Sequence, residues 1–198
     1  PRGARVWAVG PAYASKSLWA LWTACGLSRA GYRVVYLSQD NTRAIDHDRL
    51  SRMRPDPDLT RLTVYSNEGF DLNLVEHRSV LRGLTDGADL VVIDTLRKCW
   101  NGDENDNQAL TAFDRDVLAP IANTGTTVVV VHHTGNPSAF SPRTGVSSAR
   151  GASSIGQGAD VYLNFHPDKA DRGLVRIEHA KNRYGQTVAD AYLRSVQT

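Results

Sequence analysis

The sequence contains few cysteines, little excess charge and no long apolar run. Two cysteines in 198 residues do not suffice for a disulfide framework or a cysteine zinc site, and they favour a reducing, cytoplasmic compartment. No apolar stretch approaches the roughly 20 residues that cross a bilayer, and no secretory signal is recognisable, so we expect no membrane partner. The net charge of +2 is too small to indicate nucleic acid by itself.

The sequence does contain enough apolar material for one sizeable core. Hydrophobic residues make up 41% of the chain, and 198 residues fit the usual size of one domain. We therefore expect a single domain over residues 1–198. Because Pro1 stands where a Met would begin a natural chain, we expect this domain to be part of a longer protein.

Four short runs of apolar, β-branched residues predict strands that are buried on both faces, as in a parallel sheet between helices. Segments with helical spacing separate these runs, which predicts an α/β fold with a mostly parallel central sheet. Two later strands are expected to extend the sheet at one edge. The expected strands are 6–9, 34–37, 90–93, 127–131, 160–165 and 174–180, and the expected helices are 17–29, 72–84 and 107–123. The loops 40–60 and 134–158 are too long for plain connectors, which favours functional roles for them.

The first strand leads into Gly10–Ser17, which is typical of a phosphate-binding P-loop, with Ser15 where the pattern has its second glycine. In such a loop backbone N–H groups and the helix N-terminus surround the phosphates. Lys16 would contact the β- and γ-phosphates, and the Ser17 hydroxyl would bind Mg²⁺. The alternative is an ordinary strand–turn–helix with an exposed lysine.

Polar side chains also follow the other predicted strands. Asp94 ends the third run, where a Walker-B carboxylate would complete a Mg²⁺ site opposite Ser17. Asp40 follows the second run, which we expect beside the P-loop strand, and its carboxylate could accept a proton from the attacking water; a turn-forming role is the alternative. His133 follows the fourth run, which we expect to lie next to the strand that ends in Asp94. Its side chain could there sense the γ-phosphate.

The segment 117–159 contains no acidic residue, and Arg143 and Arg150 are its only charged ones. A mildly electropositive segment rich in Ser and Gly can approach phosphates. It is equally compatible with a neutral surface loop.

Several short motifs occur in one order, and together they resemble the RecA-type ATPase core of RepA-like hexameric replicative helicases, plasmid and phage relatives of DnaB-type helicases. The resemblance runs from Val6 to Arg194. It is carried by Gly10–Ser17, 36–40, 94–97, 103–105, 132–133, 150–154 and the late Lys-x-x-Tyr-Gly segment 181–185.

The resemblance implies a RecA-like P-loop NTPase with ATP and Mg²⁺ as cofactors. Asp40 falls where the family has its catalytic Glu, and His133 falls at the γ-phosphate sensor. Arg183, with Lys181, matches the pair that acts on the nucleotide of a neighbouring subunit, and a strand would place both on one face. The loop with Arg143 and Arg150 falls where the family contacts DNA. The nucleotide-binding residues implied are Gly10, Pro11, Ala12, Tyr13, Ala14, Ser15, Lys16, Ser17 and Leu18.

The function expected from this resemblance is an ATP-driven motor that works as a homo-oligomeric, hexameric ring on single-stranded DNA in plasmid or phage replication. Primase and other replication proteins are further expected partners. Two alternatives stay open: a RecA-like recombinase, and a regulatory or assembly module that hydrolyses nucleotide slowly or not at all. Ser15 and Asp40 depart from the family pattern, and they are the residues that keep the slow module open as an alternative.

Overall fold

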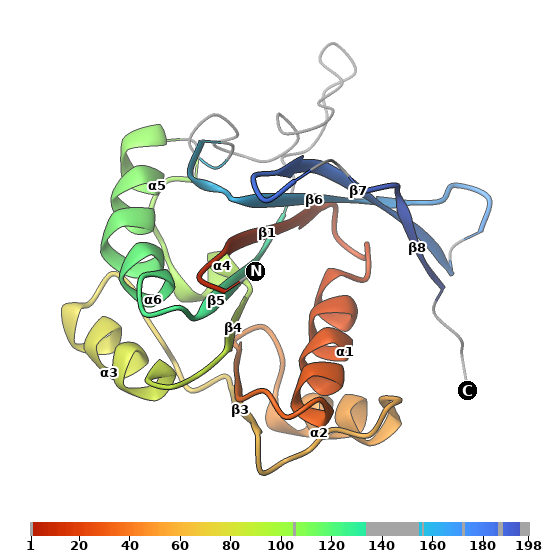
Figure 1. The fold of residues 1–198 in the computed structure, drawn as a ribbon, viewed down its shortest axis with the longest axis horizontal. Coiled ribbons are helices and arrows are strands. Elements are labelled where there is room, and N and C mark those ends of the chain that lie inside the picture. The colour runs from red at the N-terminus through yellow and green to blue at the C-terminus, as the bar shows by residue number, and fades with distance from the viewer. Residues whose placement is uncertain are drawn as a thin grey trace.

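The computed structural model describes residues 2–104, 106–133, 155, 157–171, 173–185 and 188–194. Within these residues, eight strands form one mixed sheet in the order β3-β2-β4-β5-β1-β6-β7-β8 (Figure 1). The strands from β3 to β6 run parallel, and β7 and β8 continue the sheet in antiparallel register. The strands are β1 (Arg5–Gly10), β2 (Val34–Ser38), β3 (Leu62–Ser66), β4 (Leu90–Asp94), β5 (Thr127–His133), β6 (Val161–Pro167), β7 (Leu174–Asn182) and β8 (Ala191–Arg194).

Helices cover both faces of the parallel part of the sheet. Figure 1 shows α1 and α2 on one side and α3, α5 and α6 on the other. Two apolar layers result: one joins α1 to the sheet through Leu21 and Cys25, and the other joins α5 and α6 through Phe113 and Ile121. The helical segments are α1 (Lys16–Arg29), α2 (Arg43–Arg52), α3 (Val75–Thr85), α4 (Leu96–Cys99), α5 (Asn107–Phe113), the π-helical turn η1 (Asp114–Leu118) and α6 (Ala119–Ala122).

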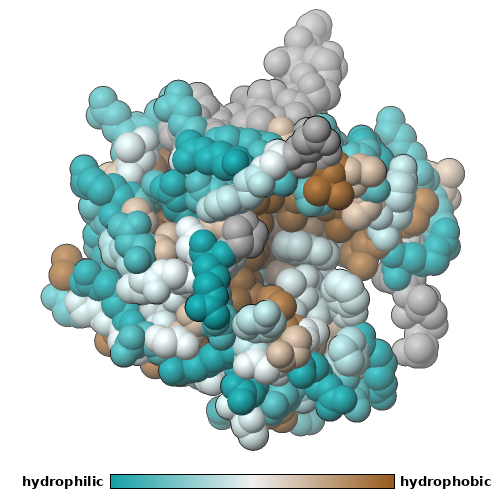
Figure 2. All heavy atoms as spheres, viewed as in Figure 1, coloured by the Kyte–Doolittle hydropathy of each residue, from teal (hydrophilic) through white to brown (hydrophobic). Residues whose placement is uncertain are grey.

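The surface is polar over most of the view in Figure 2, and apolar atoms gather in a hollow near its middle and toward one side. Both cysteines are buried and free. Of the helices in the described residues, none is both long enough and apolar enough to span a membrane.

The predicted fold class is confirmed, and all six predicted strands are present. Three expectations were correct only in part. The segment 40–60 is not simply a loop, because α2 occupies Arg43–Arg52. The helix expected over 72–84 begins only at Val75, and the helix expected over 107–123 is interrupted by the π-helical turn η1. The sequence interpretation also missed β3 and β8.

Candidate functional site

The predicted phosphate-binding loop connects β1 to α1 at the carboxyl edge of the sheet. Gly10 leaves no room for a side chain, because a Cβ there would lie 2.8 Å from the carbonyl oxygen of Phe165 on β6. Tyr13 and Ser15 have positive φ angles of 63° and 55°. Glycine adopts such angles without steric cost, which explains why the pattern has glycine at the position of Ser15. Ser15 adopts the left-handed conformation nonetheless.

The nine residues from Gly10 to Leu18 form this loop and the first turn of α1. Pro11 and Ala12 are exposed, and Tyr13 is fully exposed at 100%. Ala14 is buried, and Leu18 is half-buried. The loop therefore presents its outer half to solvent, where a ligand can approach, while its inner half is fixed in the fold.

Lys16 is the buried cation of the loop, with 4% of its surface exposed. Its Nζ donates hydrogen bonds to the carbonyl oxygens of Gly10, at 2.9 Å, and Pro11, at 2.6 Å. Burial lowers the pKa of Lys16 to about 8, and the negative charge of Asp94 only partly opposes this shift. An anionic ligand in the loop would therefore meet a pre-positioned ammonium group.

Asp94 lies at the end of β4, almost fully buried, and its two carboxylate oxygens have different partners. Oδ1 accepts a hydrogen bond from the Ser17 hydroxyl at 2.9 Å, and Oδ2 accepts one from the Tyr36 hydroxyl at 2.6 Å. Burial raises the pKa of Asp94, and these two hydrogen bonds oppose the shift because they stabilise the ionised carboxylate. The structure thus brings together Ser17 and Asp94, the two residues predicted to hold Mg²⁺.

The Ser17 hydroxyl and the Asp94 carboxylate suit Mg²⁺, which prefers oxygen ligands and is commonly held by one or two protein groups together with substrate phosphates.

Tyr36 was missed as a site residue. Its position inside the apolar run 34–37 made it look like part of the core. The sequence did contain one indication of this role: Tyr36 carries a hydroxyl on a strand that is otherwise apolar on both faces. A buried phenol usually forms a hydrogen bond, so a polar partner could have been expected.

Asp40 is near this site, but not for the reason the sequence suggested. Its strand β2 does not lie beside β1, because β4 and β5 stand between them. Instead, β2 pairs with β4, and the N–H of Gln39 donates to the carbonyl oxygen of Asp94 at 2.7 Å. The Asp40 carboxylate lies 3.5 Å from Lys98 Nζ, and its side chain is 48% exposed. Asp40 is also close enough for its charge to contribute to the raised pKa of Asp94.

The two histidines at the end of β5 face opposite sides of the sheet. His132 is buried and its ring packs edge-on against Trp7, with ring centroids 5.8 Å apart. His133 alternates with it and is partly exposed on the α1 side, paired in register with Gly10. The structure therefore places His133 next to the first residue of the phosphate-binding loop.

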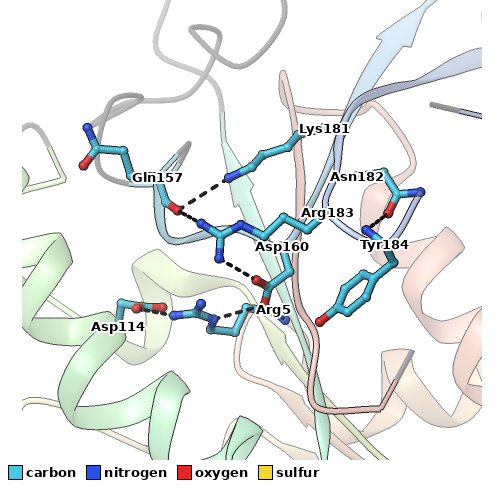
Figure 3. Close-up of polar contacts among 8 residues, drawn as sticks. All are labelled: Arg5, Asp114, Gln157, Asp160, Lys181, Asn182, Arg183 and Tyr184. Carbon is cyan, nitrogen blue, oxygen red and sulfur yellow. Dashed lines mark hydrogen bonds and ion pairs between the residues drawn. The ribbon is translucent and has the colours of Figure 1, made fainter. Parts of the chain in front are cut away.

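Arg183 and Lys181 lie beside the start of β6, at the amino end of the parallel strands, and Figure 3 shows their contacts. Arg183 Nη1 forms an ion pair with Asp160 Oδ1 at 3.1 Å, and its Nη2 donates to the carbonyl oxygen of Gln157 at 3.0 Å. Lys181 Nζ donates to the same oxygen at 3.4 Å. The two basic side chains thus point the same way, as predicted, although Arg183 lies in the turn after β7 and not on the strand.

Arg5 joins Asp160 to the π-helical turn. It forms ion pairs with Asp160 Oδ2 at 3.2 Å and with Asp114 Oδ2 at 2.6 Å. Arg5 begins β1 and Gly10 ends it, so this cluster lies about 17 Å from the loop, at the usual rise of ~3.3 Å per strand residue. Arg183 therefore does not reach the phosphate-binding loop of its own chain.

The two predicted DNA-binding arginines, Arg143 and Arg150, lie outside the described residues. The loop 134–158 is described only at residues 155, 157 and 158. The expected contact with DNA therefore stays a prediction.

Comparisons with known proteins identify a family and a shared fold. A protein family described as "AAA domain" matches residues 1–139. A solved structure described as an "ATPase Domain" matches with a TM-score of 0.74 and 17% identity, over 98% of this chain and 82% of that one. A second, "The Structure Of A DnaB-Like Replicative Helicase And Its Interactions With Primase", matches with a TM-score of 0.74 and 16% identity, over 99% of this chain.

This chain spans only 56% of the second structure. No curated protein matches the sequence significantly. Because both structures are less than one-fifth identical to this chain, the likeness concerns the fold. At that level the resemblance to RecA-type helicase ATPase domains is confirmed.

Proposed function

Because this chain belongs to the AAA domain family, we propose that it is the ATP-hydrolysing core of a replicative helicase of the plasmid or phage type. In this proposal it binds ATP between the subunits of a homo-oligomeric, hexameric ring and moves along single-stranded DNA. The family and the fold support an ATPase of the helicase type. The ring, the movement on DNA and the kind of replication system are the finer parts of the proposal.

One observation carries the proposal: the Ser17 hydroxyl lies 2.9 Å from the Asp94 carboxylate, directly after a loop that encloses the Lys16 ammonium group. These residues come from α1, which follows β1 through the loop, and from β4, and they meet at the carboxyl edge of the sheet, where open α/β sheets bind their ligands. A cation for phosphates and two oxygen donors for a divalent metal are thereby brought together.

Each residue then has a definite role. Lys16 neutralises the β- and γ-phosphates, and the backbone from Gly10 to Leu18 surrounds them. Ser17 and Asp94 would hold Mg²⁺, which supplies charge neutralisation on the phosphate oxygens. Binding and orientation of this kind provide most of the catalysis of phosphoryl transfer.

Asp40 and His133 would act on the γ-phosphate side. We assign to Asp40 the orientation of the attacking water and acceptance of its proton. Its position beside Asp94 supports this role, although its carboxylate also forms an ion pair with Lys98 at 3.5 Å. We assign to His133 the contact that senses the γ-phosphate, because it is paired in register with Gly10.

Arg183, supported by Lys181, would act on the nucleotide of the neighbouring subunit. Its location at the far end of β1 from its own loop supports action in trans, as does the 51% exposure of its side chain. An arginine supplied in this way contributes 10³ to 10⁵ in rate in other phosphoryl-transfer enzymes, on the order of 4 to 7 kcal/mol of barrier. Single-stranded DNA would contact Arg143 and Arg150, and a primase is a further proposed partner.

Mixing of variant subunits tests the ring. Lys16→Ala subunits keep Arg183 but lose the phosphate contact, and Arg183→Ala subunits bind nucleotide but lack the trans cation. Each alone should hydrolyse ATP at less than roughly 1% of the original rate, and mixed rings should regain part of it. Arg176→Ala is the matched control, because Arg176 is likewise a basic residue in an ion pair, here with Asp190, and lies on β7, the strand that precedes Arg183. Full activity of Arg183→Ala alone, or no recovery on mixing, would reject Arg183 as the trans residue.

A second candidate function is a nucleotide-binding module that hydrolyses slowly or not at all. Two observations favour it: Ser15 holds a backbone conformation that suits glycine, and Asp40 is paired with Lys98. Turnover in the presence and absence of single-stranded DNA distinguishes the two functions. The motor requires hydrolysis that DNA accelerates, and the module binds nucleotide without turning it over.

A further inference from the structure

Tyr36 lies in the middle of β2 and is buried, yet its hydroxyl reaches Asp94 at the carboxyl end of β4. The side chain is 2% exposed. Tyr36 is paired in register with Val92 on β4, so Asp94, two residues further along β4, lies on the same face of the sheet. The Tyr36 hydroxyl is 2.6 Å from Asp94 Oδ2 and 3.3 Å from the carbonyl oxygen of Ser17.

The two carboxylate oxygens of Asp94 accept hydrogen bonds from two different hydroxyl groups. Oδ2 is engaged by the buried phenol, and only Oδ1 points to the Ser17 hydroxyl. A carboxylate held at both oxygens cannot rotate about its terminal torsion, which is otherwise soft. Ser17 and Asp94 are therefore presented in one relative orientation.

We propose that Tyr36 is the positioning residue for Asp94, and that it sets the affinity of the nucleotide site for Mg²⁺ without contacting the metal or the phosphates. The inference rests on the proposed function, in which Ser17 and Asp94 hold that ion. Groups that orient metal ligands in this way typically change metal affinity by 10-fold to 100-fold when they are removed.

The test is the Mg²⁺ dependence of ADP binding by Tyr36→Phe, followed with a fluorescent ADP analogue. The ring and its packing are preserved, and only the hydroxyl is lost. Affinity for ADP in EDTA should stay within about twofold of the original, because Lys16 and the loop are untouched. The Mg²⁺ concentration that gives half of the metal-dependent gain in affinity should rise at least tenfold.

Tyr65→Phe is the matched control, since Tyr65 lies on the neighbouring strand β3 and its ring packs against Phe70. It should leave the Mg²⁺ dependence unchanged. An unaltered Mg²⁺ dependence in Tyr36→Phe would overturn the inference. If the original chain itself binds ADP without any Mg²⁺ dependence, the proposed metal site fails, which is a separate result.

A double variant keeps the inference testable if Tyr36→Phe does not fold. Removal of the phenol leaves one oxygen of a buried, charged carboxylate without its donor, which is costly. Neutralising that group in Tyr36→Phe/Asp94→Asn should restore folding if Tyr36 acts through Asp94. A double variant that is as unstable as Tyr36→Phe would show that the Tyr36 hydroxyl stabilises the fold independently of Asp94, and would overturn the inference.

Discussion

The buried Lys16 predicts that nucleotide affinity falls as the pH rises above about 8. In the unfolded chain a lysine titrates near 10.5, and burial lowers the pKa of Lys16 in the folded chain to about 8. Phosphates bound beside the ammonium group favour its charged form and raise this pKa again. Above pH 8 the free site has lost the proton that the bound site requires, so binding must take up a proton.

The size of the effect follows from this shift. Affinity should fall tenfold per pH unit above 8, which amounts to roughly 30-fold between pH 7 and pH 9.5. The same shift acts on stability with the opposite sign. Between about pH 8 and 10.5 the unfolded chain holds the proton and the folded chain does not, so stability without nucleotide should increase with pH there. The full difference is on the order of 3 kcal/mol.

Calorimetric titration with ATP in EDTA, from pH 7 to 9.5, measures the affinity without the metal. Repeating it in buffers of different ionisation enthalpy measures the proton uptake, which should approach one proton above pH 9. Lys16→Arg is the matched control, because a guanidinium stays charged throughout this range. An affinity that is constant over the range, or a slope that is identical in Lys16→Arg, would refute the reasoning.

Three further predictions concern the loop, the base and the DNA contact. Ser15→Gly removes a side chain from a residue with left-handed backbone angles and should stabilise the chain by up to about 1 kcal/mol in thermal unfolding. A destabilised variant would show that the backbone of Ser15 is not strained. Asp40→Asn should retain ATP binding and lower turnover by roughly 10² in a phosphate-release assay, and an unchanged rate would place the base elsewhere. Replacing Arg143 and Arg150 by Ala should weaken single-strand binding and reduce its salt slope by about one unit per lost phosphate contact; an unaltered slope would remove this segment from the DNA interface.

The parallel sheet could be predicted from the sequence because its central strands are apolar on both faces. Runs such as 90–93 and 127–131 have no polar face, and only burial between helices accommodates them. The strand β3 was missed because it lies at the edge of the sheet and only one of its residues, Leu62, is buried. The helix α2 was missed because it buries only Asp46 and carries no apolar stripe.

The sequence allowed prediction of the parts of the candidate site that are made of consecutive residues. It did not allow prediction of the parts that depend on the order of strands in the sheet. The residues from Gly10 to Ser17 are contiguous, so the strand, loop and helix that they form could be predicted from their pattern. Asp40 was assigned to a strand beside β1, although the parallel crossovers place β4 and β5 between them. The contact of Tyr36 with Asp94 depends on the pairing of β2 with β4, which a single sequence does not reveal.

The most direct test of the central claim is the rate of phosphate release from ATP, with Mg²⁺ and single-stranded DNA, for the original chain and for Asp94→Asn. This substitution keeps the shape of the side chain but removes the charge that Ser17 and Tyr36 orient. The account predicts hydrolysis that DNA accelerates in the original chain and a loss of roughly 10² or more in the variant. Equal rates in the two proteins would contradict it.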